Sequence, residues 1–376
     1  MFGPFGSSPG IHRRRWLGLV ALLLSLAVVE QLQAAAAGPL DQIIDGAKKE
    51  GTLRGQWSQN SFGGSAGLAD LVAGMNKKYG LNLKPQFTPG PDMQRLMLRL
   101  AQEAEAGQPA STDVYLGNSQ AIFDAMKAKV LKPVEWARIL PRKIPPEPGF
   151  EPTAPENVAV IFASAVVGIL YNTDLVKGDD VPRSLEDVLK PKWKGKIAST
   201  PYAAGFRELA MPGLLGREYV LEFTKKLSKQ IGGLVRCGEA ERFTSGEFLM
   251  LVLTCGGSDV NVLQSTGAPL AHTVVKEGTV IHPRYAGVPK NSRSPNAGAL
   301  LAAYLHTPEG QALLWKHDGM DLHLYPESKM KKEVDQVKMS GGKIAFNTPQ
   351  WLASLKGYSE TQKELEKILR EGGGGK

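Results

Sequence analysis

Two arginines stand where the chain could hold an anionic ligand. Arg207 begins a predicted helix directly after a predicted strand, and Arg236 follows another predicted strand. In an open α/β sheet, ligands bind beyond the carboxyl ends of the strands. A guanidinium group binds carboxylate or phosphate through two parallel hydrogen bonds, and Tyr202 adds an aromatic face and a hydroxyl. These residues predict an anion site, with an ordinary surface position of each arginine as the alternative.

The same strand-end argument applies nearer the N-terminus. Trp57 and Ser58 end one predicted strand, and Asn118 and Ser119 end another. Core packing is the alternative role for Trp57. The Gly-rich run 63–67 opens a predicted helix whose free amides suit an anion, but it lacks the lysine and the glycine spacing of nucleotide-binding loops.

Motifs of catalysis and of metal binding are missing from the sequence. It contains no nucleophile elbow and no H-E-x-x-H motif. The segment 317–323 is rich in His and Asp, but its spacing matches no zinc motif. We therefore predict no metal site and no cofactor.

The N-terminal segment 1–37 has the pattern of a cleaved signal peptide. Arginines at 13–15 precede the uncharged run 16–29, and alanines at 34–37 form a cleavage site. The run is shorter than the roughly 20 residues that span a membrane, although an uncleaved anchor remains the alternative. We predict cleavage after residue 36 or 37 and export to the bacterial periplasm by the Sec or the twin-arginine route.

Export affects the oxidation state expected of the two cysteines, Cys237 and Cys255, which are the only ones in the chain. The periplasm permits disulfides, and a disulfide between these residues would stabilise the fold by about 3 kcal/mol. Two buried free thiols are the alternative.

The composition is that of a folded globular chain. The 376 residues are 42% hydrophobic and 22% charged, which predicts two or three domains. The net charge of +8 agrees with an anionic ligand but does not indicate nucleic-acid binding. Helical and strand patterns alternate along the chain, which predicts an α/β fold. The Pro-rich stretch 141–155 predicts an ordered approach to a second lobe.

Short motifs follow one another along the mature chain in a known order. They lie at 47–53, 76–80, 106–114, 167–174, 191–197 (P-K-W-K-G-K-I), 245–247 and 294–312. In this order the chain resembles bacterial extracellular solute-binding proteins of family 1, which are the secreted receptors of ABC importers. The resemblance is to the group that includes ferric-ion, thiamine and aminoethylphosphonate receptors.

The resemblance implies a type II periplasmic-binding-protein fold, in which two lobes with mixed sheets are joined by two crossing hinge strands. The crossings are expected near 158–165 and 284–288. The first lobe would then comprise 38–160 and the return segment 286–376, with C-terminal helices and a Gly-rich tail. The second lobe would comprise 161–285. Hinge closure around a ligand between the lobes is the expected motion.

Matching by motif implies ligand contacts from both lobes. In the first lobe these are Trp57, Ser58, Gln59, Gly90, Asp92 and Asn118. In the second lobe they are Thr200, Tyr202, Gly205, Arg236, Gly257, Ser258 and Asp259, to which the strand-end argument adds Arg207.

The expected class of ligand follows from one difference between this chain and the ferric-binding members of the family. Ferric-binding relatives carry a tandem tyrosine pair in the segment that matches 255–260, where this chain has C-G-G-S-D-V. A small anionic or zwitterionic solute, or a metal complex, is therefore expected, with ferric ion as the alternative.

The implied function is capture of this solute and delivery to an ABC permease in the inner membrane. We expect a monomer that is not an enzyme and has no nucleic-acid partner. The alternatives are a ligand receptor for a membrane sensor and a cleft enzyme that uses Cys237 or Cys255 as its nucleophile.

Overall fold

The computed structural model describes residues 1, 3, 38–236 and 239–373. The predicted signal peptide therefore lies outside the described residues, apart from residues 1 and 3, and so do Cys237 and residues 374–376 of the Gly-rich end. Within the described part of the chain, no helix has the length and apolar character needed to cross a membrane.

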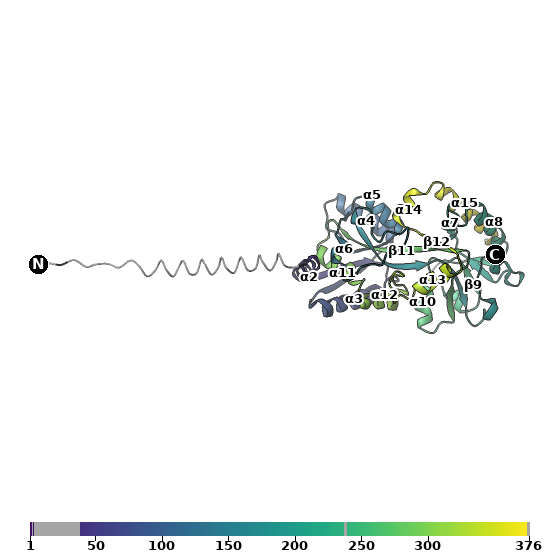
Figure 1. Ribbon diagram of the computed structural model, residues 1–376, viewed down its shortest axis with the longest axis horizontal. Coiled ribbons are helices and arrows are strands. Elements are labelled where there is room, and N and C mark those ends of the chain that lie inside the picture. Colours follow the sequence, from purple (N-terminus) through teal and green to yellow (C-terminus); the bar gives the residue numbers. More distant parts are fainter. Residues whose placement is uncertain (2, 4–37, 237–238, 374–376) are drawn as a thin grey trace.

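Two strands run through the centre of the molecule and connect its two ends (Figure 1). They are β5 (Ala159–Val166) and β11 (Gly278–Pro289), which pair antiparallel with an irregularity between Arg284 and Tyr285. Every residue of β5 is buried, as expected for a strand that is covered on both faces. The strands coincide with the crossings expected from the sequence.

The group of elements at one end of these strands, here called the first lobe, is built mainly from the N-terminal part of the chain. Its strands are β1 (Thr52–Trp57), β2 (Lys84–Pro89), β3 (Tyr115–Asn118) and β4 (Leu131–Lys132). β1 and β2 pair parallel, whereas β3 and β4 pair antiparallel with β11. Its helices are α2 (Pro39–Glu50), α3 (Gly64–Tyr79), α4 (Met93–Glu105), α5 (Ser119–Lys127), α6 (Trp136–Ile139), α11 (Pro295–Tyr304) and α12 (Pro308–Asp318).

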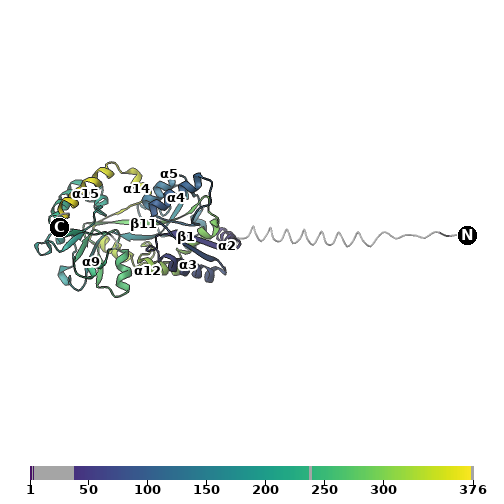
Figure 2. The same ribbon diagram turned by 180° about the vertical axis from the view of Figure 1, so that it is seen from behind.

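The second lobe, at the other end, is a mixed five-stranded sheet covered by helices (Figure 2). The strand order is β10 (Leu270–Thr273), β6 (Ile169–Asn172), β9 (Met250–Val252), β7 (Ile197–Ser199) and β8 (Gly233–Leu234). Its helices are α7 (Phe206–Leu209), α8 (Arg217–Ser228), α9 (Glu241–Thr244) and α10 (Ser258–Ser265). Short 3-10 turns lie at Pro155–Asn157, Gly178–Asp180, Glu186–Leu189 and Pro191–Trp193. The predicted two-lobed α/β fold with mixed sheets is confirmed.

The last part of the chain crosses between the lobes. β12 (Lys343–Phe346) pairs parallel with β11 after α13 (Lys331–Met339), and α14 (Pro349–Ser354) then packs against α5 of the first lobe. The amphipathic helix α15 (Tyr358–Gly373) packs along α8 and α7, and it buries Leu365 and Leu369 in the core of the second lobe.

This packing differs from the expectation that all of 286–376 returns to the first lobe, because the apolar side of α15 fits the apolar side of α8. We propose that the C-terminal helix α15 belongs to the second lobe. The other lobe boundaries remain predictions from the sequence.

Candidate functional site

Two hollows, one in each lobe, meet at Arg284 on the crossing strand β11. The hollow of the first lobe has a volume of about 370 Å³ and includes Trp57, Ser58, Gly90, Asp92 and Asn118 in its walls. The hollow of the second lobe has a volume of about 120 Å³ and includes Arg236, Cys255, Gly256, Gly257, Ser258 and Asp259. Arg284 lines both hollows, so we treat them together as one site, called the cleft below.

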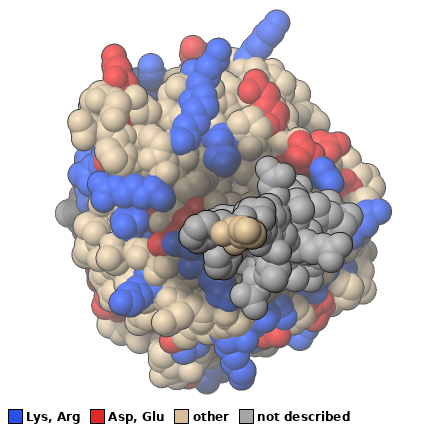
Figure 3. All heavy atoms as spheres, turned by 90° about the vertical axis from the view of Figure 1, so that its left-hand side faces the viewer, with Lys and Arg blue, Asp and Glu red and all other residues tan. Residues whose placement is uncertain are grey.

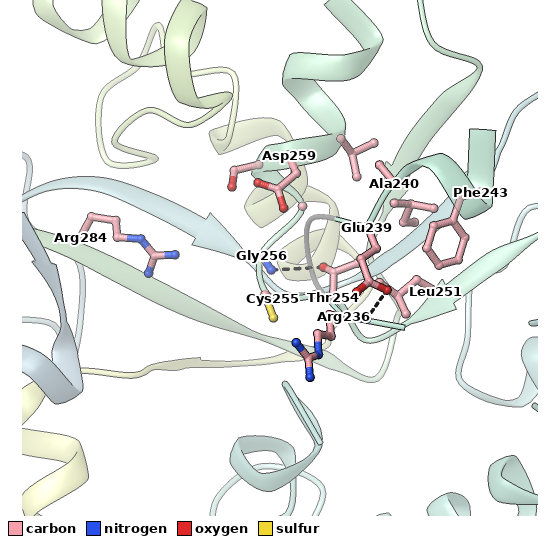
Figure 4. Close-up of a pocket in the computed structure, with 14 residues that line it drawn as sticks. Arg236, Glu239, Ala240, Phe243, Leu251, Thr254, Cys255, Gly256, Asp259 and Arg284 are labelled. Carbon is pink, nitrogen blue, oxygen red and sulfur yellow. Dashed lines mark hydrogen bonds between the residues drawn. The ribbon is translucent and has the colours of Figure 1, made fainter. Parts of the chain in front are cut away.

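Arg284 carries its charge in a buried position where part of its hydrogen-bonding capacity is unused. Figure 4 shows its side chain extending from β11 on the side of the cleft where Cys255 and Asp259 lie. Its Nε atom is buried and has no hydrogen-bond partner among the described residues. Burial lowers the pKa of Arg284, while Asp318 and Asp259 act in the opposite direction. An arginine in a protein nevertheless stays protonated, so the cleft holds a positive charge with an unused donor.

The N-terminus of α10 forms the floor of the second hollow, and two glycines shape it. Gly256 and Gly257 have φ angles of 133° and 70°, which residues with a Cβ rarely adopt. A Cβ on Gly256 would also lie 2.5 Å from the Cβ of Ala165, and one on Gly257 would lie 2.7 Å from the His272 ring. Gly256 therefore brings the backbone close to the crossing strand β5, and Gly257 brings it close to His272 of β10. The first amides of a helix have no intrahelical partner, which suits an anion.

Two carboxylates near Arg284 are poorly placed for ionisation. Asp318, at the end of α12, accepts a hydrogen bond of 2.8 Å from the Phe62 amide, yet burial raises its pKa to about 7. Asp259 is reached by solvent, but the surrounding cleft walls also raise its pKa. Partial protonation of Asp318 near neutral pH weakens its pairing with Arg284 and leaves more of the arginine charge available to a ligand.

Trp57 combines core packing with a position in the cleft wall. Its indole ring packs edge-on against Phe87 and Phe62, with ring centroids 5.3 and 6.2 Å away. Only 3% of Trp57 is exposed, and its Nε1 atom is buried without a hydrogen-bond partner in the described part of the chain. Trp57 therefore packs in the core and also lines the first hollow, where its Nε1 is a second unpaired donor.

Two polar residues of the first hollow also begin helices. Asp92 caps α4 by accepting a hydrogen bond of 2.9 Å from the Arg95 amide, and Asn118 caps α5 by accepting one of 2.9 Å from the Ala121 amide. Capping fixes each side chain at the end of its preceding strand or loop, where it faces the cleft.

Nine of the predicted site residues line the cleft, and the remaining five do not. Gln59 lies beside the backbone of Gly64. Thr200 is buried and accepts a hydrogen bond of 3.1 Å from the Ala204 amide, while Gly205 begins α7 with a φ angle of 77°. The Tyr202 hydroxyl lies 3.8 Å from the sulfur of Cys255, which lines the second hollow.

Arg207 is the predicted residue whose surroundings differ most from the expectation. Its Nε donates a hydrogen bond of 2.9 Å to Glu208, and its guanidinium also donates one of 3.0 Å to Gln362. Arg207 and Arg236 therefore do not share a site, because the neighbouring buried carboxylate holds Arg207 elsewhere. Sequence reasoning missed Arg284. The single arginine of the mostly apolar strand 278–289 was the available signal.

The cysteine of the cleft is not a free thiol. Cys255 is disulfide-bonded, and Cys237, the only other cysteine of the sequence, lies outside the described residues. A disulfide sulfur is not a nucleophile, so the idea of a cleft enzyme loses Cys255 as its reactive group.

A further polar pocket lies beside the cleft, and we call it the hinge pocket. It has a volume of about 260 Å³ and is lined by residues that include Asn118, Ser119, Arg207, His282, Asn347 and Tyr358. Behind it lies Glu208, which is fully buried. Glu208 Oε1 accepts hydrogen bonds from Arg207 at 2.9 Å, Tyr358 at 3.0 Å and Asn347 at 3.3 Å.

The charges of the hinge pocket follow from its packing. Burial alone would raise the pKa of Glu208, but Arg207 and the bonds to Glu208 hold the pKa below its usual range. Burial lowers the pKa of His282 to about 4. At pH 7 the pocket therefore contains an ionised carboxylate and a neutral imidazole.

Two α/β lobes, two crossing strands and a charged cleft between the lobes are the features of a type II periplasmic binding protein. The family model for bacterial extracellular solute-binding proteins matches residues 112–349, and the chain belongs to that family.

Among curated proteins, the Fe(3+)-binding periplasmic protein of Serratia marcescens is 28% identical over 214 residues. This match covers 56% of the chain and 55% of the relative, so it spans about half the length of each.

Solved structures share the fold across nearly all of the described chain. The substrate-binding protein of an ABC transporter from Agrobacterium tumefaciens has a TM-score of 0.64 at 14% identity, and covers 85% of this chain and 94% of its own. Iron-bound HitA from Pseudomonas aeruginosa has a TM-score of 0.58 at 17% identity, with coverages of 84% and 99%. AfuA from Actinobacillus pleuropneumoniae, with fructose-6-phosphate bound, has a TM-score of 0.56 at 18% identity, with coverages of 86% and 99%.

Proposed function

We propose that this protein captures a small anionic or zwitterionic solute, or an anionic metal complex, in the cleft and delivers it to an ABC permease. The observation that carries the proposal is Arg284, whose buried Nε has no partner among the described residues. A buried charged group without a hydrogen bond is costly, and an acceptor on a ligand would relieve that cost. Arg284 lines both hollows, so one ligand could bind both lobes through it.

Recognition would use donors from three parts of the chain. Arg284 supplies a charge at the crossing strand, α10 supplies the free amides of its first turn, and Arg236 lies at the edge of the second hollow. Closure of the lobes would bring the Trp57 side of the first hollow onto the ligand. The basic residues of the chain are not confined to the cleft, because the outer face of the first lobe also carries many of them (Figure 3). Specificity therefore depends on the few buried donors.

The donor set favours some ligands over others. The names of the solved relatives mention iron, iron with citrate, and fructose-6-phosphate. Carboxylate and phosphate oxygens can accept hydrogen bonds from Arg284 and from helix amides. A bare ferric ion would lie beside an arginine, and the segment 255–260 offers no tyrosine to hold it. We therefore place an oxygen-rich anion first and a ferric complex of such an anion second.

The proposed location is the periplasm, reached after cleavage of residues 1–37 by the Sec or the twin-arginine route. The mature protein would act as a monomer, with the permease in the inner membrane as its partner and no chemical step of its own. The family supports a secreted binding role, and the basic–apolar–alanine pattern of the N-terminus supports the signal peptide.

A thermal-shift screen tests the proposal. The protein would be purified from the periplasm, freed of ligand by unfolding and refolding, and offered phosphonates, carboxylates, sugar phosphates, neutral sugars, ferric citrate and ferric ion. A ligand at 100 times its Kd stabilises a protein by about 2.7 kcal/mol, which is a shift of a few degrees in Tm.

Arg284→Met should reduce the shift to less than about half, whereas Arg217→Met should keep it, because Arg217 lies on the surface of α8 and pairs with Glu364. A shift from neutral sugars alone, or an equal shift in Arg284→Met, would contradict the anion proposal.

A further inference from the structure

The hinge pocket adjoins the first hollow of the cleft. Gln94 and Asn118 line both of them, and Gln94 donates a hydrogen bond of 3.4 Å to Asn118. His282 of the hinge pocket and Arg284 of the cleft lie two residues apart on β11, so their side chains leave the same face of the strand about 7 Å apart. A ligand held at Arg284 could therefore extend into the hinge pocket.

The walls of the hinge pocket are polar but nearly neutral. Arg207 is the charged residue among the lining residues, and the Glu208 carboxylate balances it at a distance of 2.9 Å. A carboxamide group donates and accepts hydrogen bonds, and so does a hydroxyl group. The pocket therefore fits a neutral group with several hydroxyls better than an ammonium group or a second anion. The lining residues with carboxamide side chains are Gln94, Asn118, Gln120, Asn347 and Gln362.

Part of the hydrogen-bonding capacity of these walls is unused. Asn347 is only 7% exposed, and its Nδ2 donates to Glu208, but its Oδ1 has no partner among the described residues. Gln120 uses its Nε2 on Asp124, at 3.1 Å, which leaves its oxygen for another donor. Buried polar atoms are nearly always paired in native proteins. The pocket volume of about 260 Å³ has room for the missing donor on a ligand or on ordered water.

We propose that the hinge pocket is a second subsite of the cleft and binds the hydroxyl groups of a solute whose anionic end lies at Arg284. This inference rests on the proposed function, and it narrows the solute to a polyol that carries a phosphate or a carboxylate. Asn347 Oδ1 would accept a hydrogen bond from one hydroxyl, and carboxamide nitrogens would donate to hydroxyl oxygens. Zwitterionic solutes are less suited, because no carboxylate is among the described lining residues to pair with an ammonium group.

The subsite draws on both lobes. Gln120 lies on α5 of the first lobe and Arg207 on α7 of the second, whereas Tyr358 and Gln362 lie on α15. A polyol that contacts residues from both sides would stabilise the arrangement in which these elements are close together. Its hydroxyls would therefore add to closure of the lobes as well as to affinity.

Calorimetric titration of the ligand-free mature protein with matched pairs of anions tests the subsite. The pairs are sorbitol-6-phosphate with hexyl phosphate, and gluconate with hexanoate. The members of a pair share the anionic group and the chain length and differ in their hydroxyls. In the pair whose anionic group binds, the polyol should bind more than about tenfold tighter, because an alkyl chain leaves polar groups of the pocket without partners.

Variants locate this preference in the hinge pocket. Asn347→Leu removes the unpaired oxygen at nearly constant size and should reduce the preference to less than about threefold. If Asn347→Leu does not fold, Gln120→Leu replaces it with the same expected loss, because Gln120 is exposed and lines the pocket. Gln102→Leu is the matched control and should keep the preference, because Gln102 is exposed on α4 and is not among the lining residues.

The outcomes separate the subsite from the proposed function. Equal affinity for the two members of a pair, with weaker binding of both in Arg284→Met, would overturn the subsite and leave the anion site in place. Ordered water alone would then fill the hinge pocket. A preference for the polyol that neither Asn347→Leu nor Gln120→Leu reduces would also overturn the subsite. So would binding of none of these anions, and the thermal-shift screen then decides separately whether another anion binds in the cleft.

Discussion

The cleft and the hinge pocket border the same strand, and they leave opposite kinds of atom unpaired. In the cleft the unpaired buried atoms are N–H donors, on Arg284 and Trp57. In the hinge pocket, two residues earlier on β11, they include the acceptor oxygens of Glu208 and Asn347. The charges of the residues alone would not distinguish the cleft from the hinge pocket, because each contains an arginine. The unpaired atoms do separate them, because the cleft offers hydrogen-bond donors to a ligand, whereas the hinge pocket offers acceptor oxygens.

The two arginines show the same contrast. Arg207 has the buried carboxylate of Glu208 at 2.9 Å, whereas the Nε of Arg284 has no partner among the described residues. Removal of one partner of a buried ion pair is destabilising, whereas an unpaired donor is available for binding. Substitutions of the Arg207–Glu208 pair at the hinge pocket should therefore mainly change stability, and substitutions in the cleft should mainly change ligand affinity.

The largest expected effect is on stability, from Glu208→Gln. The substitution keeps the shape of the side chain but removes the charge that balances Arg207. Removal of one partner of a buried ion pair costs about 3–5 kcal/mol, and we expect the lower end because Arg207 is 29% exposed. Urea unfolding at pH 7 measures the loss.

The control for this prediction is Glu309→Gln, at a surface pair. Glu309 lies 3.3 Å from Lys78 and its side chain is 58% exposed, so its loss should cost less than about 1 kcal/mol. Equal effects of the two substitutions would mean that Glu208 is not a structural partner of Arg207.

A smaller effect, of opposite sign, is expected from Arg284→Met. The change removes a buried donor without a partner, so the free energy of unfolding of the ligand-free protein should stay the same or rise by about 1 kcal/mol. Affinity for the solute should fall by about 1.5–3 kcal/mol, as for the loss of a charge-assisted hydrogen bond. Unfolding and calorimetry of the same sample separate the two quantities. A large loss of stability would show that Arg284 has a structural partner that we have not identified.

Much of the fold could be predicted from the sequence, because the signals are local or ordered along the chain. The motif order, through the resemblance that it carries, predicted two α/β lobes and a crossing near 158–165, where β5 lies. The position of α15 could not be predicted in this way. Its amphipathic pattern shows that one side is buried, but the pattern does not say which lobe covers that side.

The site was predicted in part, for a related reason. Strand ends and helix starts are visible in the sequence, and they placed Trp57, Asn118 and Ser258 in the walls of the cleft. The hydrogen-bond partner of an arginine cannot be predicted from the sequence. Arg207 had the more suggestive sequence context, but the burial of Glu208 gives it a structural partner. Whether the cleft residues bind a solute stays a prediction.

The last expected effect, the smallest over any single pH unit near neutrality, is a pair of opposite pH dependences. The pKa of Asp318 is raised to about 7, so the folded protein holds a proton that the unfolded chain releases above about pH 4, and this contribution to stability is lost as pH rises toward 7. The pKa of His282 is lowered to about 4, so the unfolded chain binds the extra proton below about pH 6.5. Its contribution is therefore lost as pH falls toward 4.

Asp318→Asn keeps an oxygen for the Phe62 amide and should remove the first dependence, so that its stability relative to the unchanged protein increases from pH 5 to pH 8. His282→Gln should remove the second, so that its relative stability increases from pH 6.5 down to pH 4. Each group changes the slope by at most about 1.4 kcal/mol per pH unit. Urea unfolding across this pH range measures both slopes. Slopes of the same sign would contradict the assignment of a protonated acid to the cleft and a neutral imidazole to the hinge pocket.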